Sequence, residues 1–273
     1  MPEIAEVETV RQVLRKSLLK REIKNVNIIY DKIIESNLDE FKRIIPGMSF
    51  TEIERRGKWL LFVLNNEYYL CSHLRMEGKY FIKKHEDVID KHEHIIFELD
   101  DGYDLRYADV RKFGRMDLVK KENIEDVEGV HKQGIEPIDD KLSKEYLFDK
   151  FKKSNLPMKE LLLDQTIISG LGNIYADEVL FAAGIDPNRL GNSITLKECE
   201  KIKIVSKEII EKAILNGGTT IRSYTSSLGV IGHYQDYLMV HKREGEPCKI
   251  CNTIIKRIKI GGRSTYYCPK CQK

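Results

Sequence analysis

Four cysteines near the C-terminal end constrain the fold of this chain more than any other feature. Cys248-x-x-Cys251 and Cys268-x-x-Cys271 are separated by sixteen residues. Two such pairs supply four thiolates, the number of ligands that tetrahedral zinc takes, and the spacing is typical of zinc sites. A segment this small has little core, so the metal would provide most of its folding free energy. Two disulfides are the alternative, and a cytosolic context argues against them.

The residues between the two cysteine pairs predict a β-hairpin with a basic surface. Residues 253–260 and 264–267 can pair across Gly261-Gly262. Basic and aromatic side chains interleave in this hairpin, namely Lys256, Arg257, Lys259, Arg263, Tyr266 and Tyr267. Arg263 at the tip could hold a DNA phosphate, whereas a purely structural zinc ribbon is the alternative. The remaining cysteines, Cys71 and Cys199, are expected to be small buried hydrophobes.

The charge of the chain is unevenly distributed. Its net charge is only +3, but residues 240–273 contain nine Lys or Arg against two Glu, which gives +7 and leaves −4 for the rest. A basic tail on a mildly acidic body suggests contact with a polyanion, although basic runs are often simply solvated. No apolar run approaches the roughly 18–20 residues of a membrane span, and the N-terminus lacks a signal pattern. We therefore expect a cytoplasmic protein.

Hydrophobic spacing predicts a β-rich half followed by a helical half. Residues 3–20 have apolar residues at helical spacing. Short runs rich in β-branched and aromatic residues then predict strands and a sandwich or barrel-like domain, at 25–30, 50–55, 58–64, 68–74, 94–99 and 115–119. Helical spacing returns at 142–152, 158–165, 174–183 and 196–215. The Gly-, Ser- and Thr-rich stretch 217–232 is of a length that is usually functional or mobile.

Six segments, in order along essentially the whole chain, closely resemble the bacterial formamidopyrimidine-DNA glycosylase family. They are the N-terminus from Met1-Pro2-Glu3 to Val10, Arg56-Gly57-Lys58, His73-Leu74-Arg75-Met76-Glu77-Gly78, Asp109-Val110-Arg111-Lys112-Phe113-Gly114, the run from Gly170 to Glu178, and the zinc module with Gly262-Arg263. The resemblance implies an α+β fold. It also implies an N-terminal β-sandwich domain with a flanking helix (1–125), a helical domain with a helix–two-turn–helix motif (126–239) and a hairpin zinc finger (240–273).

The resemblance implies amine chemistry at the start of the chain. Removal of Met1 would make Pro2 a secondary amine that attacks C1′ of a damaged nucleotide, expels the base and remains as an iminium, after which the strand is cut by β,δ-elimination. Glu3 is then the acid/base group, a role that needs a carboxyl with a raised pKa. Lys58 and Arg263 complete the catalytic set. Other readings are an ordinary Met-Pro start, a first-turn Glu that favours the helix dipole, and an exposed strand Lys.

The family's DNA-binding residues also have counterparts. The target base must leave the stack, and Met76, Arg111 and Phe113 match the residues that fill the gap, with Arg111 donating to the widowed cytosine. Phosphate contacts are implied for His73 and Asn173 besides Lys58 and Arg263. Site-lining positions are Lys159, Glu6, Glu77, Thr219, Thr220 and Tyr224, the last three in the 217–232 loop, which resembles a lesion-capping lid. Ordinary packing, a surface salt bridge or a core histidine would explain these residues individually.

Three departures and three rival functions qualify the resemblance. Ala5, Val110 and Lys112 differ from common family residues, which puts loop rigidity in doubt but removes no catalytic atom. One rival is an oxidised-pyrimidine glycosylase of the endonuclease-eight-like type, which lacks the Arg111-x-Phe113 pair. A damaged-DNA-binding protein without activity is another, although Pro2, Glu3 and Lys58 argue against it. A metal-dependent hydrolase is the third, but four Cys ligands leave no open position on zinc, so the expected zinc is structural. The expected partners are oxidised-purine duplexes and abasic DNA, and the expected state is a monomer.

Overall fold

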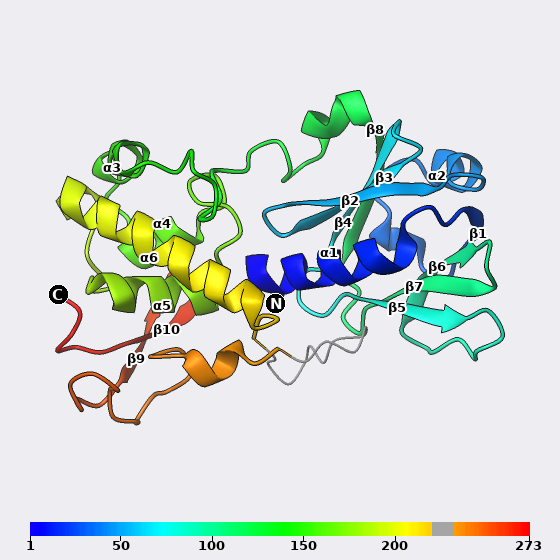
Figure 1. Cartoon of the computed structure of the whole chain (residues 1–273). Coiled ribbons are helices and arrows are strands. Elements are labelled where there is room, and N and C mark those ends of the chain that lie inside the picture. The colour runs from blue at the N-terminus through cyan, green and yellow to red at the C-terminus, as the bar shows by residue number, and fades with distance from the viewer. Residues whose placement is uncertain (220–231) are drawn as a thin grey trace. The chain divides into compact units, whose positions relative to one another are not determined.

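The computed structural model describes residues 1–219 and 232–273 (Figure 1). Most of the expected lesion-capping loop, with Thr220 and Tyr224, lies outside the described residues. The chain forms two compact units. The N-terminal unit takes in residues 1–2 and 6–131, and the C-terminal unit takes in residues 3–5, 132–219 and 233–273. Residues 3–5 therefore pack with the C-terminal unit, although the other residues of that unit begin only at position 132.

Two four-stranded antiparallel sheets build the N-terminal unit (Figure 1). One has the order β1-β6-β7-β5 and the other the order β2-β3-β4-β8. The strands are β1 (Ile23–Ile28), β2 (Phe50–Arg56), β3 (Trp59–Leu64), β4 (Tyr68–His73), β5 (Lys79–Lys84), β6 (Glu93–Leu99), β7 (Tyr103–Ala108) and β8 (Arg115–Lys120). The predicted sandwich is confirmed, since buried side chains of both sheets share one core.

Helix α1 (Ile4–Leu18) completes this core. Val7, Val10, Leu14 and Leu18 recur at three- and four-residue spacing, so they face the sheets together, and all are buried. Helix α2 (Leu38–Ile44) begins where the Asn37 side chain accepts hydrogen bonds from two first-turn amides. The aromatic rings of Phe62 on one sheet and Tyr80 on the other are 5.4 Å apart, which joins the two layers.

Strands β5 and β7 were not among the predicted strands, and for β7 buried charge explains why. Arg106 in β7 is fully buried, and its guanidinium binds the carboxylates of Glu93 and Asp104. It also donates to the carbonyl oxygens of Lys84, His85, Asp87 and Val88. These partners satisfy the charge and hold the loop 85–92 against the sheet.

The C-terminal unit is helical and ends in the predicted hairpin (Figure 1). Its helices are α3 (Lys144–Lys152), α4 (Met158–Leu163), α5 (Asn173–Ala183) and α6 (Leu196–Leu215), and its strands are β9 (Lys256–Ile260) and β10 (Arg263–Tyr267). Thr195 and Glu198 form a capping box at the start of α6. Short 3-10 helices occur in the two units at η1 (Asp31–Ile33), η2 (Lys121–Asp126), η3 (Gly191–Ser193) and η4 (Tyr234–Tyr237). Within the described residues, no helix is both long and apolar enough to cross a membrane.

Candidate active site and zinc centre

The Glu3 carboxylate sits on the N-terminus of α5. Glu3 is 2% exposed, and its Oε2 accepts hydrogen bonds from the amides of Gly172 (2.7 Å) and Tyr175 (3.3 Å), while Oε1 accepts from Ile174 (3.0 Å). These are amides that a helix leaves unpaired at its start, where the helix dipole also favours an anion. The three amides therefore hold the buried carboxylate in a fixed orientation at the start of α5.

Covalent geometry fixes the neighbour of this carboxylate. Pro2 precedes Glu3 by one peptide bond, so their Cα atoms are about 3.8 Å apart whatever the rest of the chain does. Pro2 is buried, and Met1 is 37% exposed. The predicted nucleophile and the predicted acid/base group therefore remain neighbours.

Two glycines let the start of the chain approach α5 closely. The amide of Ile4 donates to the carbonyl oxygen of Gly170 at 3.0 Å. A Cβ on Gly170, whose φ is +90°, would lie 2.7 Å from the Ile4 Cβ, and a Cβ on Gly172 would lie 2.5 Å from Glu3 Oε1. The Gly-Leu-Gly-Asn turn therefore accommodates residues 3–5, besides opening the helix.

Asn173 connects α5 to the zinc-finger hairpin. Its side-chain Nδ2 donates to the carbonyl oxygen of Ser264 at 2.9 Å, which places it beside the exposed Arg263 at the start of β10. The buried Oδ1 atom of Asn173 has no hydrogen-bond partner among the described residues. The structure therefore brings together two of the predicted phosphate contacts, Asn173 and Arg263.

Lys159 is fully buried, and its ammonium points inward. Nζ lies 2.6 Å from Asp177 Oδ1 and 2.9 Å from the carbonyl oxygen of Asn173. The other Asp177 oxygen lies 2.7 Å from Nδ1 of His241, which is 4% exposed. Neither Asp177 nor His241 was among the predicted site residues. The only sequence signal was the position of Asp177 inside the family-like run from Gly170 to Glu178.

Lys58 and His73 lie in a positively charged part of the N-terminal unit. Lys58 is 6% exposed and follows Gly57, whose φ is +57°. Burial, followed by the charges of Arg75, Lys58 and Arg115, lowers the pKa of His73 to about 3, so its imidazole is neutral. Nδ1 of His73 accepts from the Arg75 amide, which leaves the proton on Nε2. Nε2 is thus a neutral donor suited to a phosphate oxygen.

The loops that carry the predicted gap-filling residues converge on Tyr107. A Cβ on either Gly78 or Gly114 would collide with the Tyr107 hydroxyl, so both loops pack tightly on this buried ring. Met76 and Phe113 are 37% and 54% exposed. The structure therefore presents both apolar side chains to solvent from the same region.

Asp109 shapes the loop that holds Arg111 and Phe113. Its carboxylate, 1% exposed, accepts from the amides of Arg111 (3.0 Å), Phe113 (2.9 Å) and Gly114 (2.8 Å). The Arg111 guanidinium lies 4.8 Å from the centre of the Phe113 ring, which is cation–π distance. A non-glycine residue with positive φ, Lys112 at +57°, sits at the turn, a strain typical of functional loops.

The remaining predicted pocket residues have separate positions. Glu6 is buried in α1 at 5% exposure, and Thr219 is buried at 4% exposure after α6. Glu77 lines a cavity of about 450 Å³ in the N-terminal unit, together with residues of β5, β6 and the Asp109 loop.

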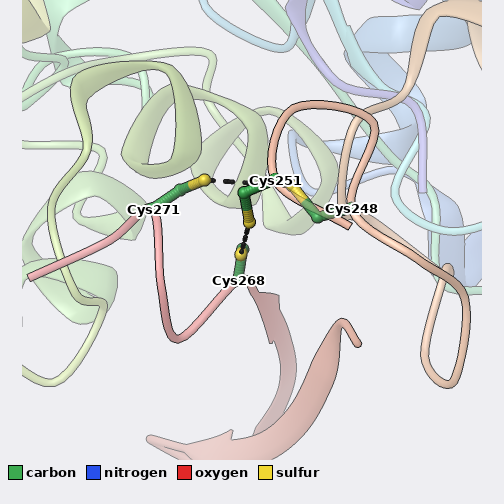
Figure 2. Close-up of side chains that lie close together, drawn as sticks. All are labelled: Cys248, Cys251, Cys268 and Cys271. Atoms are coloured by element: carbon green, nitrogen blue, oxygen red, sulfur yellow. Dashed lines mark hydrogen bonds between the residues drawn. The ribbon is translucent and has the colours of Figure 1, made fainter. Parts of the chain in front are cut away.

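The four cysteines of the hairpin module form one cluster. Figure 2 shows their side chains converging, and the four sulfur atoms lie within 4.8 Å of one another. Cys251 and Cys268 sulfurs are 3.4 Å apart and those of Cys248 and Cys271 are 3.9 Å apart, so neither pair is covalently bonded.

This donor set fits zinc. Without a cation, burial and the neighbouring thiols raise the pKa of Cys271 to about 12, whereas hydrogen bonds involving Thr253 lower the pKa of Cys251 to about 6. Four thiolates so close together would repel one another without a cation. A divalent metal holds all four sulfurs as thiolates and offsets this repulsion. Cys248, Cys251, Cys268 and Cys271 thus form a structural zinc site with no open position, as predicted.

Three family profiles match the chain. They are described as the formamidopyrimidine-DNA glycosylase N-terminal domain (residues 1–116), the formamidopyrimidine-DNA glycosylase H2TH domain (133–225) and the zinc finger found in FPG and IleRS (245–273).

Whole-chain relatives agree. The formamidopyrimidine-DNA glycosylase of Bacillus anthracis is 43% identical and that of Ligilactobacillus salivarius 44% identical, each over 100% of this chain and 99% of the relative. Among solved structures, a complex of Lactococcus lactis Fpg with abasic-site DNA has a TM-score of 0.94, with 36% identity and 99% coverage of both chains. A complex of a variant of that protein with Fapy-dG DNA has a TM-score of 0.95, with 36% identity and full coverage of both chains.

Fold, site and zinc centre together define a DNA glycosylase of the helix–two-turn–helix class. The chain belongs to the formamidopyrimidine-DNA glycosylase family, the base excision repair enzymes of oxidised purines. The resemblance stated from the sequence is confirmed.

Proposed function

We propose that this protein excises 8-oxoguanine and formamidopyrimidines from duplex DNA and then cuts the abasic strand. The observation that carries the proposal is the position of Glu3, one peptide bond from Pro2. Its buried carboxylate accepts hydrogen bonds from the Gly172 amide and from two amides of α5. After removal of Met1, the Pro2 amine attacks C1′, and the base leaves with its bonding electrons and a proton. The sugar ring then opens: the C1′–O4′ bond breaks, O4′ takes a proton, and the proline nitrogen and C1′ form an iminium. The iminium acidifies the C2′ proton, and β,δ-elimination then breaks the C3′–O and C5′–O bonds, with each phosphate leaving with its bonding electrons.

Glu3 serves the proton transfers of this sequence. A carboxylate that accepts from backbone amides keeps a fixed orientation, which acid/base catalysis requires. Lys58 and His73 on the N-terminal unit, and Asn173 and Arg263 on the C-terminal unit, supply four phosphate contacts. The neutral Nε2–H of His73 donates a hydrogen bond, whereas Lys58 and Arg263 contribute charge.

Met76, Phe113 and Arg111 act on the duplex itself. The two exposed apolar side chains insert into the gap that the flipped base leaves in the base stack. Arg111 donates hydrogen bonds to the O2 and N3 acceptors of the opposite cytosine. Asp109 holds the loop in this shape through three amides. The Arg111–Phe113 pair supports oxidised purines over oxidised pyrimidines as substrates.

Several parts of the proposal come from the relatives. Fpg proteins of Lactococcus lactis bind abasic-site and Fapy-dG DNA, which supports the same partners for this chain. The proposal also includes three domains, at residues 1–125, 126–239 and 240–273. It further includes a monomeric state and a location in the bacterial cytoplasm, where the protein associates with the nucleoid through DNA. Lys159, Glu6, Glu77 and Thr219 remain its site-lining residues, as do Thr220 and Tyr224 outside the described part.

The test is borohydride trapping on a duplex with one 8-oxoguanine opposite cytosine. We expect a covalent adduct on the N-terminal peptide that disappears in Pro2→Gly or when Met1 is retained. Strand nicking should stop in the same variants, and Arg111→Ala should lose the preference for cytosine. Duplex binding without an adduct or nicking would establish a binding-only protein. Trapping on an oxidised pyrimidine alone would establish the endonuclease-eight-like specificity.

A further inference from the structure

Three buried side chains form a continuous hydrogen-bonded triad. Lys159 on α4 is 0% exposed, Asp177 on α5 is 1% exposed and His241 is 4% exposed. The distances are 2.6 Å from the Lys159 ammonium to Asp177 Oδ1, and 2.7 Å from Asp177 Oδ2 to His241 Nδ1. A carboxylate shared between two nitrogen groups in the interior is costly unless both bonds form, so the three side chains act as one unit.

The ammonium end of this triad lies at the start of α5, the helix that binds Glu3. Lys159 donates to the carbonyl oxygen of Asn173, the first residue of α5. The amides of the two residues that follow Asn173 donate to the Glu3 carboxylate. Glu3 itself interacts electrostatically with Lys159, and so does Arg263. The charged groups that face Lys159 in the described structure are thus Asp177, Glu3 and Arg263. Asp177 is the only one that contacts its ammonium.

The imidazole end is fixed by the zinc-finger region. Glu178, the neighbour of Asp177, accepts hydrogen bonds from the amides of Met239, Val240 and His241. The His241 ring packs edge-on against Tyr266 of β10, with ring centres 5.1 Å apart. Consecutive carboxylates of α5 therefore fix the backbone and the side chain of His241 separately. Asp177 has no freedom to follow Lys159 if the latter moves.

We propose that Asp177 and His241 are positioning residues that keep the Lys159 ammonium charged and close to Glu3. The inference rests on the proposed acid/base role of Glu3. A positive charge beside the carboxylate favours its ionised form, which must be available when Glu3 accepts a proton. Burial lowers the pKa of Lys159, and Asp177 is the strongest influence that raises it. Without Asp177 the ammonium would lose its proton at a lower pH, and Glu3 would lose its neighbouring charge.

The test is the pH profile of base excision in single turnovers on an 8-oxoguanine:cytosine duplex. Asp177→Asn should lose about tenfold or more in rate at alkaline pH and regain activity as the pH falls, because Lys159 is protonated again. Lys159→Met should be slow at every pH. The matched control is Asp140→Asn, which removes the same kind of pair, Lys207–Asp140 at 2.8 Å, from the surface. It should follow the wild-type profile.

Two further variants separate positioning from folding. Lys159→Met combined with Asp177→Leu removes both buried charges. Its thermal stability should therefore exceed that of Lys159→Met alone, while its rate of base excision stays low. His241→Asn keeps a donor near Nδ1 and should retain most of the activity that His241→Leu loses. A wild-type profile in Asp177→Asn, a loss equal at every pH, or a fully active double variant would each overturn the inference. Full activity of Glu3→Gln would instead overturn the proposed role of Glu3.

Discussion

Gly172→Ala tests whether the Glu3 position is essential to catalysis. The backbone at Gly172 is extended, with φ −129°, so alanine fits the conformation without strain. The added Cβ would collide with the Glu3 carboxyl, lying 2.5 Å from Oε1 and 2.7 Å from Cγ, whereas ordinary contact begins at 3.4 Å. The carboxyl must therefore move by about 1 Å, and a displacement of this size at a reacting group costs about 10²-fold in rate.

The displacement should act on chemistry more than on DNA binding. Glu3 would lose hydrogen bonds of 2.7, 3.0 and 3.3 Å, and the expected rate loss corresponds to about 2.7 kcal/mol of transition-state stabilisation. The assay is the single-turnover rate of borohydride trapping, together with the Kd for an abasic-analogue duplex at fixed salt. We expect a slow variant with a Kd close to that of the wild type.

Gly245→Ala is the matched control for loss of stability. Its φ is +82°, and no atom of the described residues lies within 4 Å of the added Cβ, so alanine costs about 1 kcal/mol of backbone strain without touching the site. Its Tm should fall while its trapping rate stays at the wild-type value. A wild-type rate in Gly172→Ala, or an equal rate loss in both variants, would refute the reasoning.

Two more predictions concern the zinc centre and His73. Cys251→Ser or strong chelation should release one zinc per chain and abolish duplex binding at matched salt; unchanged Kd after verified metal loss would contradict a structural role. The pKa of His73 is lowered from 6.5 to about 3, so the unfolded chain binds more protons in this range and stability falls as pH drops below 6.5. His73→Gln should make unfolding in urea less pH-sensitive by up to about 1.4 kcal/mol per pH unit, and identical slopes would contradict this.

Features with local causes were predictable from the sequence. The zinc ligands occur as two Cys-x-x-Cys pairs, and the apolar residues of α6 repeat over 196–215 as predicted. Residues 3–20 were predicted to be helical because their apolar spacing is local, and α1 spans Ile4–Leu18. In each case the information lies within about one element, where spacing alone decides which side chains share a face.

The missed strands show what spacing cannot reveal. Strand β7 reads Tyr-Asp-Leu-Arg-Tyr-Ala, and its Asp104 and Arg106 are both almost fully buried. A sequence pattern treats charges as exposed, but here Glu93, thirteen residues away, completes the ion pair. Strand β5 is similarly hidden by its lysines, one of which pairs with the same Glu93. Tertiary partners thus override the alternation that identifies a half-buried strand.

The same limit applies to the candidate site, where it bears on catalysis. Glu3 was predicted as the acid/base group, but the sequence could not reveal its partners, because Gly172 and Ile174 lie about 170 residues away. Asp177 and Glu178 look like helix residues of a motif, yet one bonds Lys159 and His241 and the other accepts three amides from 239–241. Neighbouring residues of a helix point in different directions, so the two carboxylates need separate buried partners. Those partners come from distant parts of the sequence, and only the structure shows which substitutions test the role of each carboxylate.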